Sequence, residues 1–364
     1  MSKENVNRRV AVIAISLILL SLLTVRAENT APSIPDDMFW RMIAGFSEEG
    51  GTFRYENLLS NETSYQTVIP TLKQTRDALQ QPGAYIGVGP EQNFTYIAAL
   101  EPKVAFIVDI RRQNMLEQLM YKALFETSRN RVDFISRLFS RRPGTLNDDL
   151  PLDQLFKSFS SEDCDRQMLS RTMQVIEDRL MNEHAFPLKT ADLAGMQHVL
   201  ETFCAAGPQI DYGFVNAPSN LTAPSYAELM TATDGKGQNW SYLATSANFE
   251  RIRKLQMNNR IVPLVGNFAG KKALHAVAQF LKMKDIIVTV FYVSNVEQYL
   301  NPSQADLFRL NVAALPILST SMFIRFVPPE STVLEPISGF LKNHPSLFHL
   351  LDSGISEHSP SSAH

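Results

Sequence analysis

Two short apolar runs stand out in the pattern of hydrophobic and polar positions along the chain. The first, residues 84–86, leads into the turn Gly87-Val88-Gly89, and the second, residues 104–108, stops at Asp109. A segment with helix-like spacing joins the two runs. Apolar runs that are bounded by turn signals and joined by a helix are typical of a βαβ unit with buried, parallel strands. We therefore expect a strand at each run and a helix between them.

Further runs of the same kind extend this pattern along the chain. Strands are expected at residues 210–216, 261–265 and 286–293 and near 322–327. Amphipathic helices are expected at residues 37–46, from 65 or 70 to about 80, and at 114–128, 129–142, 161–182, 190–204, 247–258 and 273–282. Asp36 or Asp37 is a plausible cap of the first helix. The alternation of strands and helices predicts an α/β fold, a Rossmann-like, doubly wound and mostly parallel sheet.

The composition of successive segments predicts how the chain is divided. We expect a signal peptide or membrane anchor at residues 1–27, an N-terminal helical region at 28–82, a Rossmann-like domain at 83–351 and a disordered tail at 352–364. Residues 143–206 are polar and helical and poor in β-branched runs, which favours a helical insertion within that domain.

The N-terminus has the order of charged, apolar and small residues that is typical of a secretory signal. Lys3, Arg8 and Arg9 precede an apolar run over residues 10–25, and Ala27 is a small residue at the expected cleavage site. That run is shorter than the roughly 20 residues of a usual spanning helix, but an uncleaved anchor remains the alternative. Both readings predict an exported body, periplasmic or extracellular, or one anchored to the inner membrane. A misassigned start codon would instead leave a cytoplasmic protein that begins near Met38.

Composition and net charge limit the classes of molecule that the protein is expected to bind. The 364 residues are 45% hydrophobic and 20% charged, which is a normal globular balance, and the formal net charge is -3. A general nucleic-acid binder needs a basic face, so this charge argues against one. We expect a small-molecule ligand, no nucleic acid, and membrane contact only through an uncleaved N-terminal segment.

The two cysteines and seven histidines show no metal-ligand spacing, so no metal site is expected. Cys164 and Cys204 could pair in an oxidising compartment. The alternative is that both are unlinked thiols in the core, because free cysteine is usually a small buried residue.

The first strand and its turn carry part of a nucleotide-binding pattern. Gly87 and Gly89 allow a close approach of the backbone to a ligand, and Asp109 follows Gly87 by 22 positions. A carboxylate about 20 residues after the first glycine is where nucleotide-binding folds hold ribose hydroxyls. The third glycine of a dinucleotide fingerprint is replaced by Gln92, which weakens the case for a dinucleotide and still allows a ligand without a pyrophosphate.

Polar residues also follow the later strands, where ligands of open α/β sheets bind. Asn267 and Asn295 could orient a substrate by hydrogen bonds, and Glu297 is the plausible general base of this group. The alternative is that the asparagines cap the helices that follow. Residues 266–272 are a poor phosphate loop, because the glycines are one residue too close and Lys272 stands where Ser or Thr should hold magnesium.

The order of a glycine turn, a helix and a strand that ends on an acid resembles class I S-adenosylmethionine-dependent methyltransferases. The resemblance implies that Gly87 and Gly89 lie against the amino-acid part of S-adenosylmethionine and that Asp109 binds both ribose hydroxyls. Glu91 lies in the same turn, where that family often has glycine, and is counted with the cofactor-binding residues. Residues 87–114, 262–276 and 291–300 also resemble a group of uncharacterised bacterial proteins with no known activity.

Two functions follow from these observations. The first is an S-adenosylmethionine-binding, methyltransferase-like protein whose acceptor the sequence does not reveal. The second is a non-catalytic, exported or membrane-anchored binding or structural protein on a degenerate scaffold of that kind. The N-terminal segment separates the two, because S-adenosylmethionine is made and kept in the cytosol and an exported domain would lack it.

Overall fold

Six strands form one sheet in the computed structural model, which describes residues 32–79, 81–142, 144–212, 223–327 and 331–342. The order across the sheet is β3-β2-β1-β4-β5-β6. Strands β1 to β5 run parallel, and β6 is antiparallel to β5. The strands are β1 Ala84–Gly87, β2 Val104–Asp109, β3 Ile261–Val265, β4 Val288–Ser294, β5 Ile317–Val327 and β6 Ser331–Pro336. The fold is therefore α/β with a mostly parallel sheet.

The order of the strands reverses between β1 and β4. From β1 the chain proceeds outward through β2 to β3, and then returns to place β4 on the other side of β1. Ile86 of β1 has Phe106 of β2 as its partner on one side and Phe291 of β4 on the other. Since these strands are parallel, their carboxyl ends meet at one edge of the sheet. The loops that follow β1 to β4 are thereby brought together.

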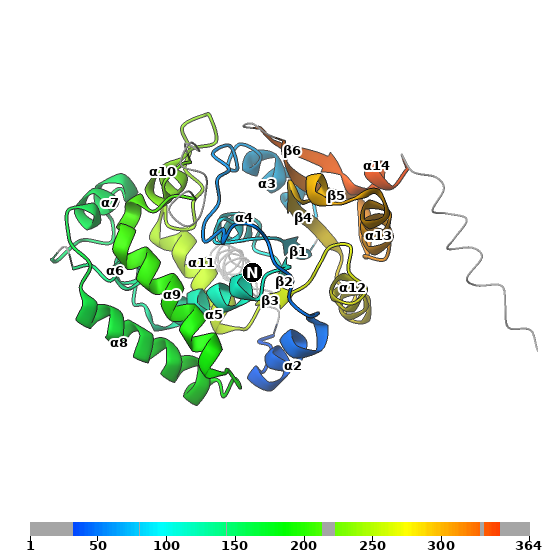
Figure 1. Cartoon of the computed structure of the whole chain (residues 1–364). Helices are drawn as coiled ribbons and strands as arrows, with labels where there is room; N and C mark the ends of the chain where they lie inside the picture. Colours follow the sequence, from blue (N-terminus) through cyan, green and yellow to red (C-terminus); the bar gives the residue numbers. More distant parts are fainter. Residues whose placement is uncertain (1–31, 80, 143, 213–222, 328–330, 343–364) are drawn as a thin grey trace, which may run out of the picture. The chain divides into compact units, whose positions relative to one another are not determined.

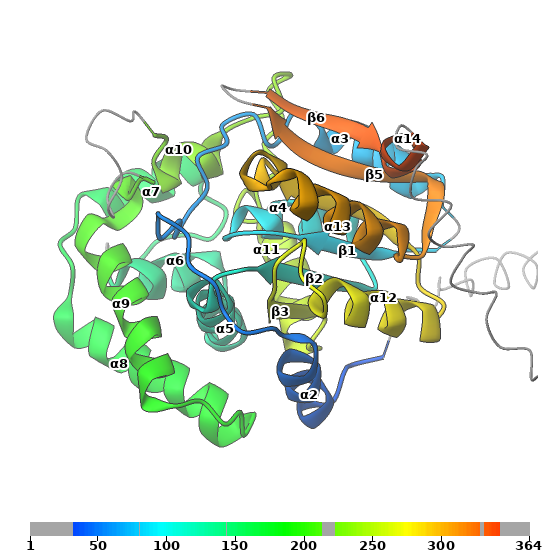
Figure 2. The same cartoon turned by 45° about the vertical axis from the view of Figure 1, so that its right-hand side comes forward.

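Helices cover both faces of the sheet. Figures 1 and 2 show α4 (Gln92–Leu100) and α11 (Ser246–Met257) on one face, and α12 (Ala273–Met283) and α13 (Pro302–Ala313) on the other. Strands β1, β2 and β3 are buried along their whole length. This burial explains why they read as continuous apolar runs rather than as alternating ones.

The N-terminal part of the described chain contains α2 (Asp36–Phe46) and α3 (Ile69–Asp77). Pro35 occupies the N-cap position of α2, where no side chain caps the helix. The expected capping role of Asp36 or Asp37 is therefore wrong. The Asp36 carboxylate instead accepts a hydrogen bond from Asn259, at 2.6 Å, and lies 2.9 Å from the His184 ring.

Most of the helices lie between β2 and β3, on the left of Figure 1. Besides α11, they are α5 Arg112–Thr127, α6 Arg131–Phe139, α7 Leu152–Ser160, α8 Arg166–Glu177, a π-helix Asp178–Glu183, α9 Thr190–Ala206, a 3-10 turn Gly207–Gln209 and α10 Tyr226–Thr231. The insertion expected at about 143–206 falls within this region. Cys164 and Cys204 form a disulfide with a Cα–Cα distance of 5.2 Å. Of the two alternatives that the sequence left open, the structure therefore has the disulfide and not two free thiols.

One expected strand does not form where the structure can be described. Within residues 210–212, Asp211 makes a single antiparallel bridge to Ser225, and residues 213–222 lie outside the described part of the chain. The segment follows a 3-10 turn that packs on α7, α9 and α10. Residues 210–212 therefore lie among helices, and no strand of the described sheet pairs with them.

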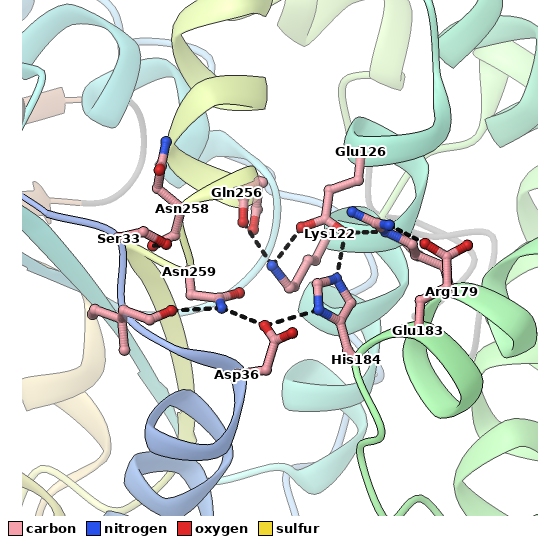
Figure 3. Close-up of polar contacts among 12 residues, drawn as sticks. Ser33, Asp36, Lys122, Glu126, Arg179, Glu183, His184, Gln256, Asn258 and Asn259 are labelled. Atoms are coloured by element: carbon pink, nitrogen blue, oxygen red, sulfur yellow. Dashed lines mark hydrogen bonds and ion pairs between the residues drawn. The ribbon is translucent and has the colours of Figure 1, made fainter.

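A buried ionic cluster joins α2 to the insertion (Figure 3). His184 lies between two carboxylates, 2.7 Å from Glu126 and 2.9 Å from Asp36. Lys122 pairs with Glu126 at 2.6 Å, and Arg179 pairs with Glu126 at 2.7 Å. Burial alone raises the pKa of Glu126, but the hydrogen bond from His184 and the charge of Lys122 outweigh it and lower this pKa to about 2.

The two ends of the chain, residues 1–31 and 343–364, are not among the described residues. The expected signal peptide or anchor at 1–27 and the expected tail at 352–364 fall in these segments. Among the helices that the structure describes, none has the length and hydropathy needed to cross a membrane.

Candidate functional site

A cavity of about 310 Å³ lies at the carboxyl edge of the parallel strands. Its lining includes Gly89 after β1, Asp109 at the end of β2, Asn267 after β3 and Ser294 at the end of β4. The segment between α2 and α3, which crosses this edge in Figures 1 and 2, forms another wall. The volume falls in the range of about 300 to 1,000 Å³ that is typical of small-molecule sites. In open α/β sheets such sites lie where the strand order reverses.

The cavity brings together part of the set of residues that the sequence singled out. Gly89, Asp109, Asn267 and Asn295 line it, although 206 positions separate the first from the last. The remaining members of the set, Gly87, Glu91 and Glu297, are not among its lining residues.

The two glycines of the turn after β1 have different surroundings. A Cβ atom at Gly87 would lie 2.0 Å from Oδ1 of Asn93, so this glycine accommodates a protein side chain. The Asn93 amide donates hydrogen bonds to the carbonyls of Val88 and Pro90, at 2.9 and 2.8 Å, and thereby fixes the turn. Gly89 has φ +80, a left-handed conformation that favours glycine, and a Cβ there would meet open space. Gly89 is thus the glycine that a ligand can approach.

Glu91 lies behind the turn rather than in the cavity wall. Its side chain is fully buried, and no described side chain donates a hydrogen bond to it. Burial raises the pKa of Glu91 to about 8, against a smaller opposing effect of the backbone amides of Glu91 and Ser60. A carboxyl group in this environment is mostly protonated at neutral pH.

Asp109 is held by an arginine two residues further along the chain. Arg111 donates to Oδ2 from Nη2 at 2.7 Å and to Oδ1 from Nε at 3.0 Å, and its backbone amide donates to Oδ1 at 2.9 Å. A carboxylate has about four lone-pair sites, so one site remains, on Oδ2. Asp109 can therefore accept one further hydrogen bond from a molecule in the cavity.

The loop after β3 already holds an anion that belongs to the protein. The Glu48 carboxylate accepts hydrogen bonds from the backbone amides of Asn267, Lys272 and Ala273 at 2.8 to 3.1 Å. A Cβ at Gly270 would overlap this carboxylate, at 2.2 Å. Glu48 thus occupies the place at the start of α12 where a phosphate would bind, in agreement with the sequence argument against a phosphate loop.

Neither asparagine of the predicted set caps the helix that follows it. Asn267 accepts a hydrogen bond from the Ala269 amide, at 2.9 Å, inside the loop, and the N-cap position of α12 is Lys272. Asn295 precedes a 3-10 turn, Val296–Tyr299, without a side-chain capping bond. Both residues line the cavity, and neither side chain is a helix cap.

Glu297 has a different role in the structure. Its carboxylate accepts a hydrogen bond from Arg325 of β5 at 2.7 Å, and Arg325 also pairs with Glu335 of β6. The Glu297 side chain is therefore committed to the antiparallel edge of the sheet.

Sequence reasoning missed the most deeply buried carboxyl group of the cavity wall, that of Glu62. This residue precedes α3 and is 2% exposed. Ser294 and Tyr292 donate to its Oε1, at 2.5 and 2.7 Å, and Gln92 donates to its Oε2 at 3.3 Å. Burial raises the pKa of Glu62 to about 7, against these hydrogen bonds, which lower it. Its neighbours in sequence are polar, as in an exposed loop, so the sequence held no local signal for it.

Aromatic side chains line another part of the cavity. The rings of Phe53 and Tyr299 meet edge to face with centroids 5.1 Å apart, and Tyr212 also lines the cavity. Tyr299 is 49% exposed, so its ring face is available to a bound molecule. No three His, Cys, Asp or Glu side chains of the described residues form a possible metal site.

The fold and this geometry describe an α/β protein with a cavity at the carboxyl edge of a mostly parallel sheet, beside the reversal of strand order. The chain belongs to a family described as a domain of unknown function, DUF7790, whose model matches residues 58–352. The match contains all six strands, Glu62 and Asp109. A comparison with curated proteins gave no match.

Proposed function

We propose that this chain binds S-adenosylmethionine in the cavity and is a methyltransferase-like protein with a Rossmann-like fold. The observation that carries the proposal is that the open glycine of the turn, Gly89, and the acid at the end of the next strand, Asp109, line one cavity. These two features are the ones on which the resemblance to class I methyltransferases rests. The acceptor of the methyl group is not identified.

The strand order supports the Rossmann-like assignment. A doubly wound sheet has crossover helices on both faces and a reversal of strand order at the ligand site. The order β3-β2-β1-β4-β5 has that reversal. Helix α4 connects the parallel neighbours β1 and β2, α13 connects β4 and β5, and α12 lies in the crossover from β3 to β4. The antiparallel strand β6 at the edge is compatible with such a sheet.

The residues present fit an adenosyl ligand in two respects. Gly89 leaves the space of a side chain open beside the turn, which suits the amino-acid part. Asp109 retains one lone-pair site on Oδ2 for a ribose hydroxyl, while Arg111 holds the carboxylate in place. When bound, this ligand supplies a methyl group on a sulfonium sulfur. The protein's part is to orient the ligand and to exclude water around it.

The disulfide favours the second function, a non-catalytic exported binding protein. Disulfides persist in oxidising compartments and are rare in the cytosol. The pair Cys164–Cys204 is therefore expected of a protein outside the cytosol, where S-adenosylmethionine is not made. On this reading the cavity binds another small molecule and the methyltransferase-like site is a remnant.

A thermal-shift measurement with millimolar S-adenosylhomocysteine separates the two functions. A ligand that binds only the folded protein raises its Tm by mass action, so we expect an increase of a few degrees for the wild type. Asp109→Asn should abolish the increase, because the amide places a donor where the carboxylate accepts.

The matched control is Asp192→Asn. Asp192 is a buried carboxylate that pairs with Arg112 at 2.8 Å and does not line the cavity. This variant should keep the full ligand-induced increase in Tm. No increase for the wild type would remove the adenosyl ligand and leave the second function.

A further inference from the structure

The Glu62 carboxyl group lies beside the reversal of strand order, where side chains from other segments donate hydrogen bonds to it. Glu62 lies in the segment before α3, and its hydrogen-bond donors come from two other segments. Gln92 is the first residue of α4, and Tyr292 and Ser294 lie at the end of β4. All four residues line the cavity. The Tyr292 hydroxyl also contacts the Gln92 amide, so the donors support one another.

The two oxygens of the Glu62 carboxyl group are not equivalent. Oε1 accepts two short hydrogen bonds from hydroxyl groups, at 2.5 and 2.7 Å. Oε2 accepts one long hydrogen bond, 3.3 Å, from Gln92. With about four lone-pair sites on a carboxylate, one remains on Oε2. Oε2 is therefore the oxygen that can accept a further hydrogen bond, and it belongs to a residue that lines the cavity.

Backbone strain accompanies this arrangement. Ser294 has φ +52, a left-handed conformation that a non-glycine residue seldom adopts, and the β4–β5 register shifts at this point. Strained residues of this kind persist where the surrounding structure requires them, and they concentrate at functional sites. Here the strained residue is the one whose hydroxyl donates the shortest hydrogen bond to Glu62.

No lysine or arginine of the described residues forms an ion pair or a hydrogen bond with Glu62. The titratable groups that face it are tyrosines: Tyr292 on β4, Tyr85 on β1 and Tyr96 on α4. Burial raises the pKa of each phenol well above its ordinary value, so all three remain neutral. Glu62 is thus the group among these four that changes charge near neutral pH.

We propose that Glu62 is a proton-exchanging residue of this cavity and that its ligand is a ring compound with an O–H or N–H group directed at Oε2. In the forward step the proton leaves the ligand oxygen or nitrogen and binds Oε2. The bond electrons stay on the ligand atom, which becomes nucleophilic. The aromatic side chains Phe53, Tyr212 and Tyr299 in the cavity lining suit a ring. The step needs no adenosyl ligand, so it holds independently of the proposed function; with that function, this compound is the methyl acceptor.

The test is chemical labelling with the uncharged reagent dicyclohexylcarbodiimide, followed by peptide mapping by mass spectrometry. The carboxyl O–H adds across one C=N bond, the oxygen to carbon and the proton to nitrogen, and the adduct rearranges to a stable N-acylurea. Only the protonated carboxyl reacts. We expect labelling of Glu62 that increases as the pH falls through about 7. Glu91, which is equally buried but does not line the cavity, should stay unlabelled.

Two variants and three added compounds complete the experiment. Glu62→Gln should lose the label, and Ser294→Ala, which removes a donor to the ionised form, should move the labelling midpoint to higher pH. Phenol should protect Glu62 more than anisole, which lacks the O–H group. Protection by S-adenosylhomocysteine reports on the proposed function alone.

The outcomes separate the two proposals. An unlabelled Glu62 in the wild type, or labelling without a transition near neutral pH, overturns the role of Glu62. Equal protection by phenol and anisole, or protection by neither, overturns the assignment of a protic ring ligand. Labelled Glu62 with protection by phenol, but not by S-adenosylhomocysteine, supports this inference and removes the adenosyl ligand.

Discussion

Buried carboxyl groups are the most informative residues of this protein. Glu62 and Glu91 are both fully buried, and burial raises the pKa of the first to about 7 and of the second to about 8. Such groups oppose folding once they ionise, because the folded protein must hold a charge that water solvates better. Both carboxyl groups lie near the carboxyl edge of the sheet, and ionisable groups with shifted pKa values are concentrated at functional sites.

The cost gives a prediction for Glu62→Gln. A carboxyl group whose pKa is higher in the folded than in the unfolded state makes the protein less stable as the pH rises from its ordinary pKa of 4.5 to about 7. The variant lacks this titration. The free energy of unfolding of the variant minus that of the wild type should therefore increase by about 3 kcal/mol between pH 4 and pH 8.

Urea denaturation at a series of pH values measures this difference. Glu177→Gln, at an exposed position of α8, is the matched control. A difference for Glu62→Gln that does not change with pH would show that Glu62 titrates like an exposed side chain.

Local sequence pattern could identify some residues of the cavity but not others. Gly89 and Asp109 were found because each stands at the end of an apolar run. Glu62 was missed because its partner Tyr292 lies 230 positions away, and no pattern links the two. The ion pair between Asp109 and Arg111 depends on a side-chain direction that residue spacing does not determine.

Helix α2 is held against the rest of the protein partly by a contact between charged side chains. The helix packs on β3 and α12, and its first residue, Asp36, reaches the cluster of His184, Glu126 and Lys122 (Figure 3). The side chains of Lys122 and Glu126 are 1% and 0% exposed. Removal of Lys122 takes a short ion pair from the buried Glu126 carboxylate, which keeps Arg179 and His184 as partners, and this loss is more costly than that of a surface pair.

Lys122→Met should therefore destabilise the protein by about 3 kcal/mol, even though methionine fits an apolar environment. The Lys122 ammonium also donates to the carbonyl of Gln256 at 2.6 Å, so that carbonyl loses a partner as well. Arg41→Met, which breaks the exposed Arg41–Asp37 pair on the same helix, is the control and should change stability little. Equal midpoints of urea unfolding for the two variants would contradict a structural role for the cluster.

The periodicity of apolar residues predicted β1 to β4, the second half of β5 and the longer helices, because these elements bury one face or both. It missed α13, although Asn301, Pro302 and Gln304 carry the signature of a helix start. Only Phe308, Asn311 and Val312 of that helix are buried, so its apolar stripe is weak. It also missed β6, which lies at the edge of the sheet and has Thr332 as its one buried residue.

For the whole molecule, the decisive feature is the reversal of strand order between β1 and β4. The sequence suggested parallel strands and helices, but not which strands are neighbours. Pairing of β4 with β1 brings Tyr292 and Ser294 to the turn that carries Gly89, and the segment between α2 and α3 adds Glu62. The cavity therefore results from the arrangement of strands and not from any single motif.

The central claim is that this cavity holds an adenosyl ligand, and a crystal structure of the protein grown with S-adenosylhomocysteine tests it most directly. We predict ligand density in the cavity, with a ribose hydroxyl within hydrogen-bond distance of Oδ2 of Asp109 and the amino-acid part beside Gly89. Density at another place on the protein, or a cavity without ligand density at a concentration that saturates binding, would contradict the account.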